Sequence, residues 1–190
     1  MTDYRFVQMI IVVILGLGLT GILANLGGQI RNRSSIEIYP LQIFASCFLL
    51  LTILMWHWSF SRTQDVNWTL PLFILNVIPP MLLTLGAQLI SVEINSPKSP
   101  QQQYFINCGF IYSILASVPF ISIIIETFIP ESLTISTEIL TGTTILRLLS
   151  GCILASLAII KKPTYHWLSL MLLYVLVTCS VSVAIFNLKF

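Results

Sequence analysis

The chain has 190 residues, of which 56% are hydrophobic and only 8% are charged. Its mean hydropathy is +0.94, and its charged fraction is about a third of that in an ordinary soluble domain. This composition excludes a disordered tail, a fibrous repeat and almost any water-soluble fold, because too few polar side chains remain to coat a globule. The net charge of +2 gives no electrostatic footprint for nucleic acid. We therefore expect a lipid bilayer to surround most of the chain.

Six long apolar runs follow one another along the chain. At 1.5 Å per residue each run extends over roughly 27 Å or more, which matches a hydrocarbon core of about 30 Å. Transmembrane strands would alternate polar and apolar residues over ~10 positions, and these runs do not. The sequence predicts an all-α, polytopic transmembrane bundle, a single domain over 1–190 with no soluble domain. The six predicted helices cover residues 6–26, 41–58, 69–90, 104–129, 139–160 and 167–186.

The ends of these runs carry residues that usually mark helix ends and the lipid headgroup layer. Trp favours that layer because its ring is half polar, and proline at a helix entrance or exit costs little because its missing N–H is not needed there. The tryptophans are Trp56, Trp58, Trp68 and Trp167, and the prolines are Pro40, Pro71, Pro130 and Pro163. These positions support the predicted limits independently of hydropathy.

The Lys and Arg content of the connections predicts an orientation. The loops after the first, third and fifth helices share one face, with Arg31, Arg33, Lys98, Lys161 and Lys162. The opposite face carries both termini, with Arg5, Arg62 and Lys189. Because the cytoplasmic side holds the basic excess, we expect a multi-pass protein of the cell inner membrane with both termini outside the cytoplasm. The first run is too long for the apolar part of a signal peptide, so we expect a retained helix.

The feature that says most about function is a charged residue, Arg147, within the membrane-spanning part of the fifth run. Arg147 lies roughly 13 Å below the terminus-bearing face, where an unpartnered arginine in lipid is costly. Glu126 is within reach at a depth of about 6 Å, and Asn76, Thr143 and Thr144 lie in the same half of the bilayer. These five residues form the candidate ligand or pore site. Two interpretations stay open: a pin between two helices, or a polar pocket that binds a phosphate or carboxylate or excludes cations from a pore.

The first run is rich in small residues. Residues 16–21 formally match the dinucleotide fingerprint, but that fingerprint needs a strand turning into a helix, so we reject it here. Gly21, Ala24 and Gly28 fall at i, i+3 and i+7, and a face that is nearly bare backbone permits close helix approach. We expect this face to pack against another helix, within the subunit or between subunits.

Two adjacent prolines, Pro79 and Pro80, stand near the middle of the third run. They remove two backbone donors and free the carbonyls of Leu75 and Asn76. Broken helices of this kind form binding sites in transporters, and prolines also produce plain kinks. The sequence favours the kink.

Cysteine and histidine give no sign of a metal or cofactor. The two histidines, His57 and His166, fall on opposite faces of the predicted bundle, so they cannot share one metal ion or one haem. Their ordinary place is the membrane interface. Lone cysteines in apolar helices behave as small hydrophobes, and the four here lie singly in four helices: Cys47, Cys108, Cys152 and Cys179. We expect no catalytic residue, no metal and no cofactor.

Residues 12–20, the basic loop around Arg31 and Arg33, and residues 56–58 (Trp-His-Trp) carry a resemblance. The chain resembles, over about its first 115 residues, an uncharacterised family of small multi-pass bacterial inner-membrane proteins. The resemblance implies a bacterial membrane protein without an assigned activity, and it supplies no site residues. Abundant isoleucine, asparagine and serine suggest an AT-rich gene, which is compatible with an accessory or defence operon.

Several functional classes remain. The first is a non-enzymatic, oligomerising scaffold, sensor or membrane anchor, whose partners would be the bilayer, further copies of the chain and a soluble or membrane protein. The second is a homo-oligomeric channel with Arg147 lining the path. A small secondary transporter fits less well, because the two halves of the chain show no convincing repeat. An enzyme fits poorly because no paired acids, Ser/His couple or histidine cluster is visible.

Overall fold

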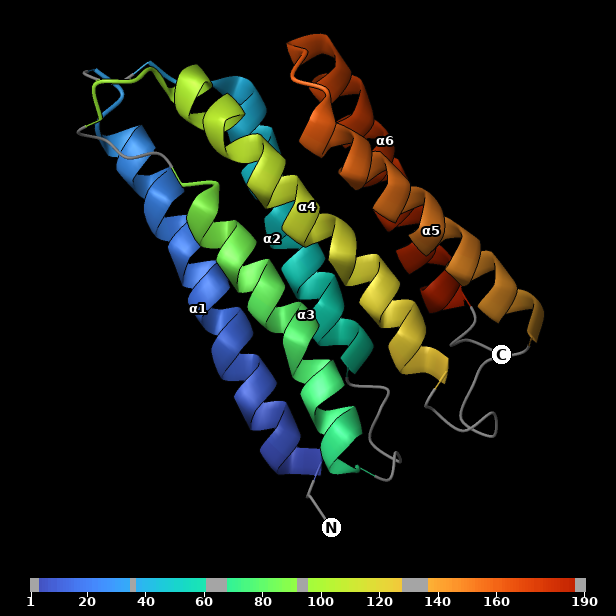
Figure 1. Cartoon of the computed structure of the whole chain (residues 1–190). Coiled ribbons are helices and arrows are strands. Elements are labelled where there is room, and N and C mark those ends of the chain that lie inside the picture. Colours follow the sequence, from blue (N-terminus) through green and yellow to red (C-terminus); the bar gives the residue numbers. More distant parts are fainter. Residues whose placement is uncertain (1–3, 35–36, 61–67, 92–95, 128–136, 187–190) are drawn as a thin grey trace.

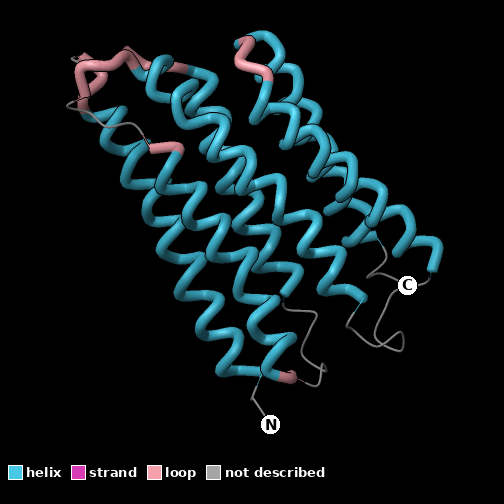
Figure 2. Tube along the Cα trace, viewed as in Figure 1, coloured by secondary structure: helices cyan, strands magenta, loops and turns pink. Residues whose placement is uncertain are grey.

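The fold is an all-α helical bundle in a computed structural model that describes residues 4–34, 37–60, 68–91, 96–127 and 137–186 (Figures 1 and 2). No strand occurs in these ranges. The helices are α1 (Tyr4–Arg31), α2 (Pro40–Phe60), α3 (Leu70–Leu89), α4 (Pro100–Thr127), α5 (Thr137–Ile159) and α6 (Pro163–Phe186). The predicted number and order of helices are confirmed.

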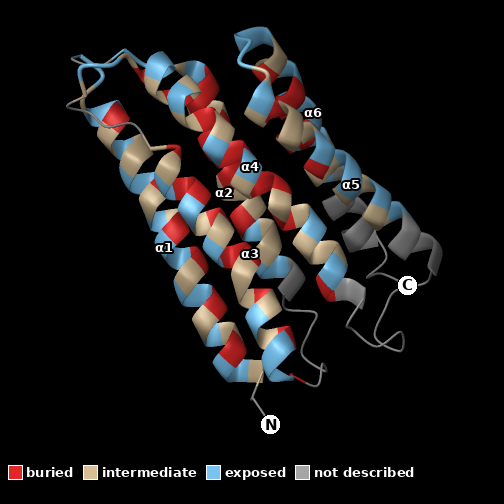
Figure 3. Ribbon diagram, in the orientation of Figure 1, coloured by how far each residue is buried: buried red, intermediate tan, exposed pale blue. Residues whose placement is uncertain are grey.

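Five helices within the described residues are long and apolar enough to cross a membrane: α1, α2, α3, α4 and α5. Large apolar side chains are exposed on these helices and on α6, and exposed positions alternate with buried ones along the ribbons (Figure 3). Such an apolar exterior is costly in water and expected in lipid. The chain therefore has the architecture of a multi-pass membrane protein. That α6 also crosses the membrane stays a prediction.

Successive helices run in opposite directions, so the connections after α1, α3 and α5 lie together at one end of the bundle (Figure 1). We call this the loop end. Helix α1 packs on α3 and α2 at one edge, α4 lies between α3 and α5, and α6 packs against α5 and α2. The basic residues of the loop end are all exposed: Arg31, Arg33, Lys98, Lys161 and Lys162.

Proline in the first turn marks the start of four helices, where its missing N–H costs no hydrogen bond. These are Pro40, Pro71, Pro100 and Pro163. The predicted starts of α4 at 104 and of α6 at 167 were each four residues late. In α4 the polar first turn is stabilised by a capping box: the Ser99 N–H donates to Oε1 of Gln102 at 3.2 Å, and the Gln102 N–H donates to Oγ of Ser99 at 3.3 Å.

The seam between α1 and α3 is a close backbone approach. A Cβ on Gly18 would lie 2.9 Å from Oγ1 of Thr84 and 3.1 Å from its Cα. The Thr84 hydroxyl donates to the carbonyl of Ile14 at 2.8 Å, so it is satisfied across the seam rather than left bare among apolar side chains. Glycine at position 18 is what lets this threonine reach the backbone of α1.

The seam between α4 and α5 also depends on glycine. A Cβ on Gly151 would lie 2.9 Å from the ring of Phe120, and one on Gly109 would lie 3.4 Å from the carbonyl of Ala158. Gly151 therefore makes room for Phe120, whereas a Cβ at Gly109 would lie at ordinary contact distance. This seam holds the second half of the bundle to α4, which in turn packs on α3.

Candidate functional site

The structure separates members of the predicted Arg147 site. Asn76 lies buried on α3, and its Nδ2 donates to the carbonyl of Leu72 in the same helix at 2.9 Å. Arg147 is half-buried on α5. Because α4 lies between these helices (Figure 1), no described Cα atoms of α3 and α5 come within 8 Å of each other. Equal depth in the bilayer does not bring Asn76 to Arg147.

The remaining members of that set lie on α5 and α4. Thr143 and Thr144 are half-buried one turn before Arg147, and the Ser150 hydroxyl donates to the Arg147 carbonyl at 2.8 Å. The side chain of Glu126 lies outside the described residues. The predicted pairing of Arg147 with Glu126 therefore stays a prediction.

The predicted packing face of α1 is largely open among the described residues. None of them lies within 4 Å of a Cβ built on Gly21, Ala24 is exposed and Gly28 is half-buried. Helix α1 turns a different line of residues toward its neighbours: Val7, Ile11, Leu15, Gly18 and Ile22. Contact of this face with a second subunit, the other alternative, stays a prediction.

The two central prolines do not interrupt their helix. Helix α3 continues from Leu70 to Leu89, and Pro79 and Pro80 are both buried within it. Neighbouring helices α1, α2 and α4 pack around α3 and support the segment where two backbone donors are missing. The broken-helix alternative is therefore not what the structure contains.

A buried polar network at the loop end was not predicted. His166, on the first turn of α6, is fully buried at the loop end; its predicted place at the membrane interface stays a prediction. Its Nε2 lies 2.7 Å from the carbonyl oxygen of Ile160, and its Nδ1 lies 2.9 Å from the hydroxyl of Tyr104. The Tyr104 hydroxyl lies 2.6 Å from that of Tyr112, and both tyrosines are buried on α4.

The chemistry of the acceptors fixes the direction of these hydrogen bonds. A carbonyl can only accept, so Nε2 of His166 carries the proton that it donates to Ile160. In the neutral imidazole Nδ1 then accepts from the Tyr104 hydroxyl, which in turn accepts from Tyr112. A second proton on His166 would reverse both hydroxyls and leave the buried Tyr112 hydroxyl without an acceptor in this chain of bonds. The arrangement thus favours the neutral histidine.

Aromatic rings enclose the histidine. The ring centroid of His166 lies 5.2 Å from that of Phe105, 5.5 Å from that of Tyr104 and 5.6 Å from that of Tyr112, all near edge-to-face geometry. Edge-to-face contacts of this kind add stability beyond burial. With both ring nitrogens bonded and its faces covered, His166 holds the α5–α6 turn in place through Ile160.

Two further polar side chains lie beside this network. The ring of Tyr39 packs edge-on against Tyr104 with centroids 5.7 Å apart; its hydroxyl is buried without a hydrogen bond to any described residue, and burial raises the pKa of that hydroxyl. Gln42 donates from Nε2 to the carbonyl of Ile90 at 2.6 Å, which joins the start of α2 to the end of α3. Its buried Oε1 has no partner among the described residues.

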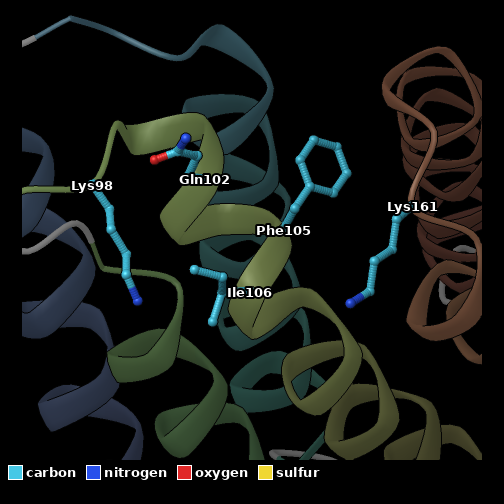
Figure 4. Close-up of a pocket in the computed structure, with 5 residues that line it drawn as sticks. All are labelled: Lys98, Gln102, Phe105, Ile106 and Lys161. Carbon is cyan, nitrogen blue, oxygen red and sulfur yellow. The ribbon is translucent and has the colours of Figure 1, made fainter.

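An open groove of about 460 Å³ lies on the outer side of α4 at the loop end (Figure 4). Five residues line it: Lys98, Gln102, Phe105, Ile106 and Lys161. Phe105 also contacts His166, so it separates the groove from the buried network. The sequence uses the lysines only to predict orientation. It cannot show that Lys98 and Lys161, which belong to two different connections, line the same groove.

Within the described residues, no three His, Cys, Asp or Glu side chains lie together as metal ligands. The expectation of no metal and no cofactor stays a prediction.

Comparison of the chain with models of known protein families, with curated proteins and with solved structures found no match. The resemblance to small bacterial inner-membrane proteins is therefore untested.

Proposed function

We propose that the chain is a non-enzymatic scaffold of the bacterial inner membrane that assembles into homo-oligomers through the outer face of α1 and anchors a partner protein there. The observation that carries this proposal is the unpacked face of α1. No described residue lies within 4 Å of a Cβ built on Gly16 or Gly27. Thr20 and Ala24, which lie on the same face, are exposed as well.

The chemistry of this face suits another helix. Gly16, Thr20 and Ala24 recur every four residues, so they align along one side and permit a close backbone approach. The Thr20 hydroxyl donates to the Gly16 carbonyl at 2.8 Å, so this hydroxyl is satisfied within its own helix. Leu17 and Leu23 stand beside the small residues, 61% and 53% exposed. Small gaps next to large apolar side chains make a surface that can interlock with a second copy of itself.

The position of α1 separates this proposal from the channel alternative. Helix α1 lies at one edge of the bundle, and α5 with Arg147 lies on the far side of α4 (Figure 1). An oligomer whose contacts run through α1 keeps Arg147 away from the symmetry axis. A pore lined by Arg147 would instead need α5 at that axis.

The bonding of the buried polar groups supports a non-enzymatic role. His166 uses both ring nitrogens in hydrogen bonds within the fold, so neither is available to a substrate. The side chain of Asn76 bonds to its own helix. A general base needs a free lone pair within reach of the substrate, and this histidine has none.

The test is the mass of the purified protein in nanodiscs, measured for the wild type and two matched variants. Gly16→Leu fills the open space on α1, and Gly142→Leu fills equally open space on α5. We expect an oligomer for the wild type and for Gly142→Leu, and a monomer for Gly16→Leu.

A monomeric wild type would contradict the proposal. An oligomer lost in Gly142→Leu and kept in Gly16→Leu would place the contact on α5 and favour the channel.

A further inference from the structure

The groove at the loop end brings together two basic residues that are far apart in the sequence. Lys98 belongs to the α3–α4 connection and Lys161 to the α5–α6 turn, and both are exposed. Their side chains extend on opposite sides of Ile106, which rises from α4 between them (Figure 4). Among the described residues, no acidic side chain lines the groove. Two ammonium groups over one open groove favour an anionic ligand.

The outer side of α4 changes from polar at the groove to apolar beyond it, where Phe110 follows the lining residues. Gln102 stands at the loop end, and Ile106 and Phe110 follow it at intervals of four residues, so all three share one side of the helix. Ile106 is 55% exposed and Phe110 is 62% exposed. The cap with Ser99 uses the amide oxygen of Gln102, and its Nε2 donates no hydrogen bond to a described residue. Its NH2 group is therefore available as a further donor.

The order of these groups, from charged and polar side chains at the loop end to apolar side chains further along α4, matches the order of headgroup and acyl chain in a phospholipid. The headgroup layer lies at the level where the apolar helices end and their basic residues begin. Below it, exposed apolar side chains contact acyl chains. A soluble phosphate compound would use the lysines but gain nothing from Ile106 and Phe110.

We propose that the groove binds the headgroup of an anionic phospholipid, with its phosphate held by Lys98 and Lys161 and an acyl chain lying along Ile106 and Phe110. The buried network behind the groove positions one of these lysines. His166 donates to the carbonyl of Ile160, the residue before Lys161, and its ring contacts Phe105 in the groove wall. The turn that carries Lys161 is thereby held against α4.

The experiment measures which lipids stay bound when the full chain is extracted from vesicles of phosphatidylcholine and phosphatidylglycerol, by mass spectrometry of the protein–lipid complexes. The variant Lys98→Gln with Lys161→Gln removes both groove lysines. The control, Arg33→Gln with Lys162→Gln, removes two exposed positive charges at the same end that do not line the groove. A lysine near an anionic headgroup contributes about fivefold in affinity, so the double groove variant should lose about 25-fold in phosphatidylglycerol retention.

The control should keep most of its preference for phosphatidylglycerol. Equal losses in both variants would show general attraction to a basic end and would overturn the site. Ile106→Ser with Phe110→Ser should also lower retention, because it removes the acyl contact. Displacement of the bound lipid by free glycerol 3-phosphate at matched concentration would identify a soluble phosphate as the ligand and would overturn the lipid assignment.

Discussion

Helices α1 and α3 meet through small residues, whereas α4 and α6 meet through a buried histidine and two tyrosines. At the first contact Gly18 lets the Thr84 side chain reach the backbone of α1. At the second, side chains of Tyr104 and His166 bridge a wider gap by hydrogen bonds. The first contact depends on the small size of Gly18, and the second depends on specific hydrogen-bond donors and acceptors.

The two modes leave different outer surfaces. Helix α1 has small residues on its outer side as well as its inner side, so it presents a face that a second helix can approach closely. The α4–α6 half uses its polar atoms internally and leaves two lysines at its rim. The first half is thus suited to contact with another subunit, and the second to contact with lipid headgroups. Substitutions at each contact can separate these roles.

Replacing His166 should have the largest effect on stability. His166→Leu removes the donor to the Ile160 carbonyl and leaves the buried Tyr104 hydroxyl without its acceptor. We expect the free energy of unfolding to fall by about 3 kcal/mol, measured by SDS titration of the detergent-solubilised protein. His57→Leu is the matched control, because His57 is exposed. Equal, small changes in both variants would mean that the network does not stabilise the bundle.

Filling the α1–α3 seam should have the next largest effect. A side chain at position 18 would overlap Thr84, so Gly18→Leu forces α1 away from α3 and should cost about 2 kcal/mol in unfolding free energy. Gly16→Leu, two residues earlier, meets open space and should leave the stability of the monomer in detergent unchanged. If Gly16→Leu were as destabilising as Gly18→Leu, the assignment of inner and outer faces of α1 would be wrong.

Removing the buried hydroxyl of Tyr39 should have the smallest effect. That hydroxyl makes no hydrogen bond to a described residue, so Tyr39→Phe should leave stability at neutral pH unchanged or raise it by about 1 kcal/mol. Because burial raises the pKa of Tyr39 in the folded state, the wild type should lose stability as pH rises above the ordinary tyrosine pKa of about 10. The variant should lack this part of the loss. Parallel stability curves for the two proteins between neutral and alkaline pH would contradict the expected pKa shift.

Hydropathy predicted the helices well because each apolar run is long and its neighbours are short polar connections. The predicted start of α4 is too late because Gln101, Gln102 and Gln103 resemble a loop by composition, and that of α6 is too late because the apolar run begins only after Thr164, Tyr165 and His166. Two local signals mark the true starts: the Ser99–Gln102 capping box in α4, and Pro163 in the first turn of α6. With those starts, Tyr104 and His166 fall inside helices rather than at their ends, where burial is the natural outcome.

The neighbours of each helix could not be predicted from the sequence. Their similar predicted depth in the bilayer suggested that Asn76 lies beside Arg147. Lateral position, however, depends on which helices pack together, and α4 lies between α3 and α5. The same limit applies to α1, which is apolar on all sides, so a pattern of small residues does not reveal which side faces inward. Gly18 and Gly21 differ little in sequence context, and only the packing distinguishes the buried glycine from the open one.

Cysteine cross-linking in native membranes tests the central claim, assembly through the outer face of α1, most directly. In a background without the native cysteines, Ala24→Cys places a thiol in the middle of that face, and Ile145→Cys places one on the exposed side of α5, where Ile145 is 52% exposed. A symmetric contact brings the same residue of two subunits together. The account predicts a covalent dimer on oxidation for Ala24→Cys and none for Ile145→Cys. A dimer through position 145 with none through position 24 would contradict it.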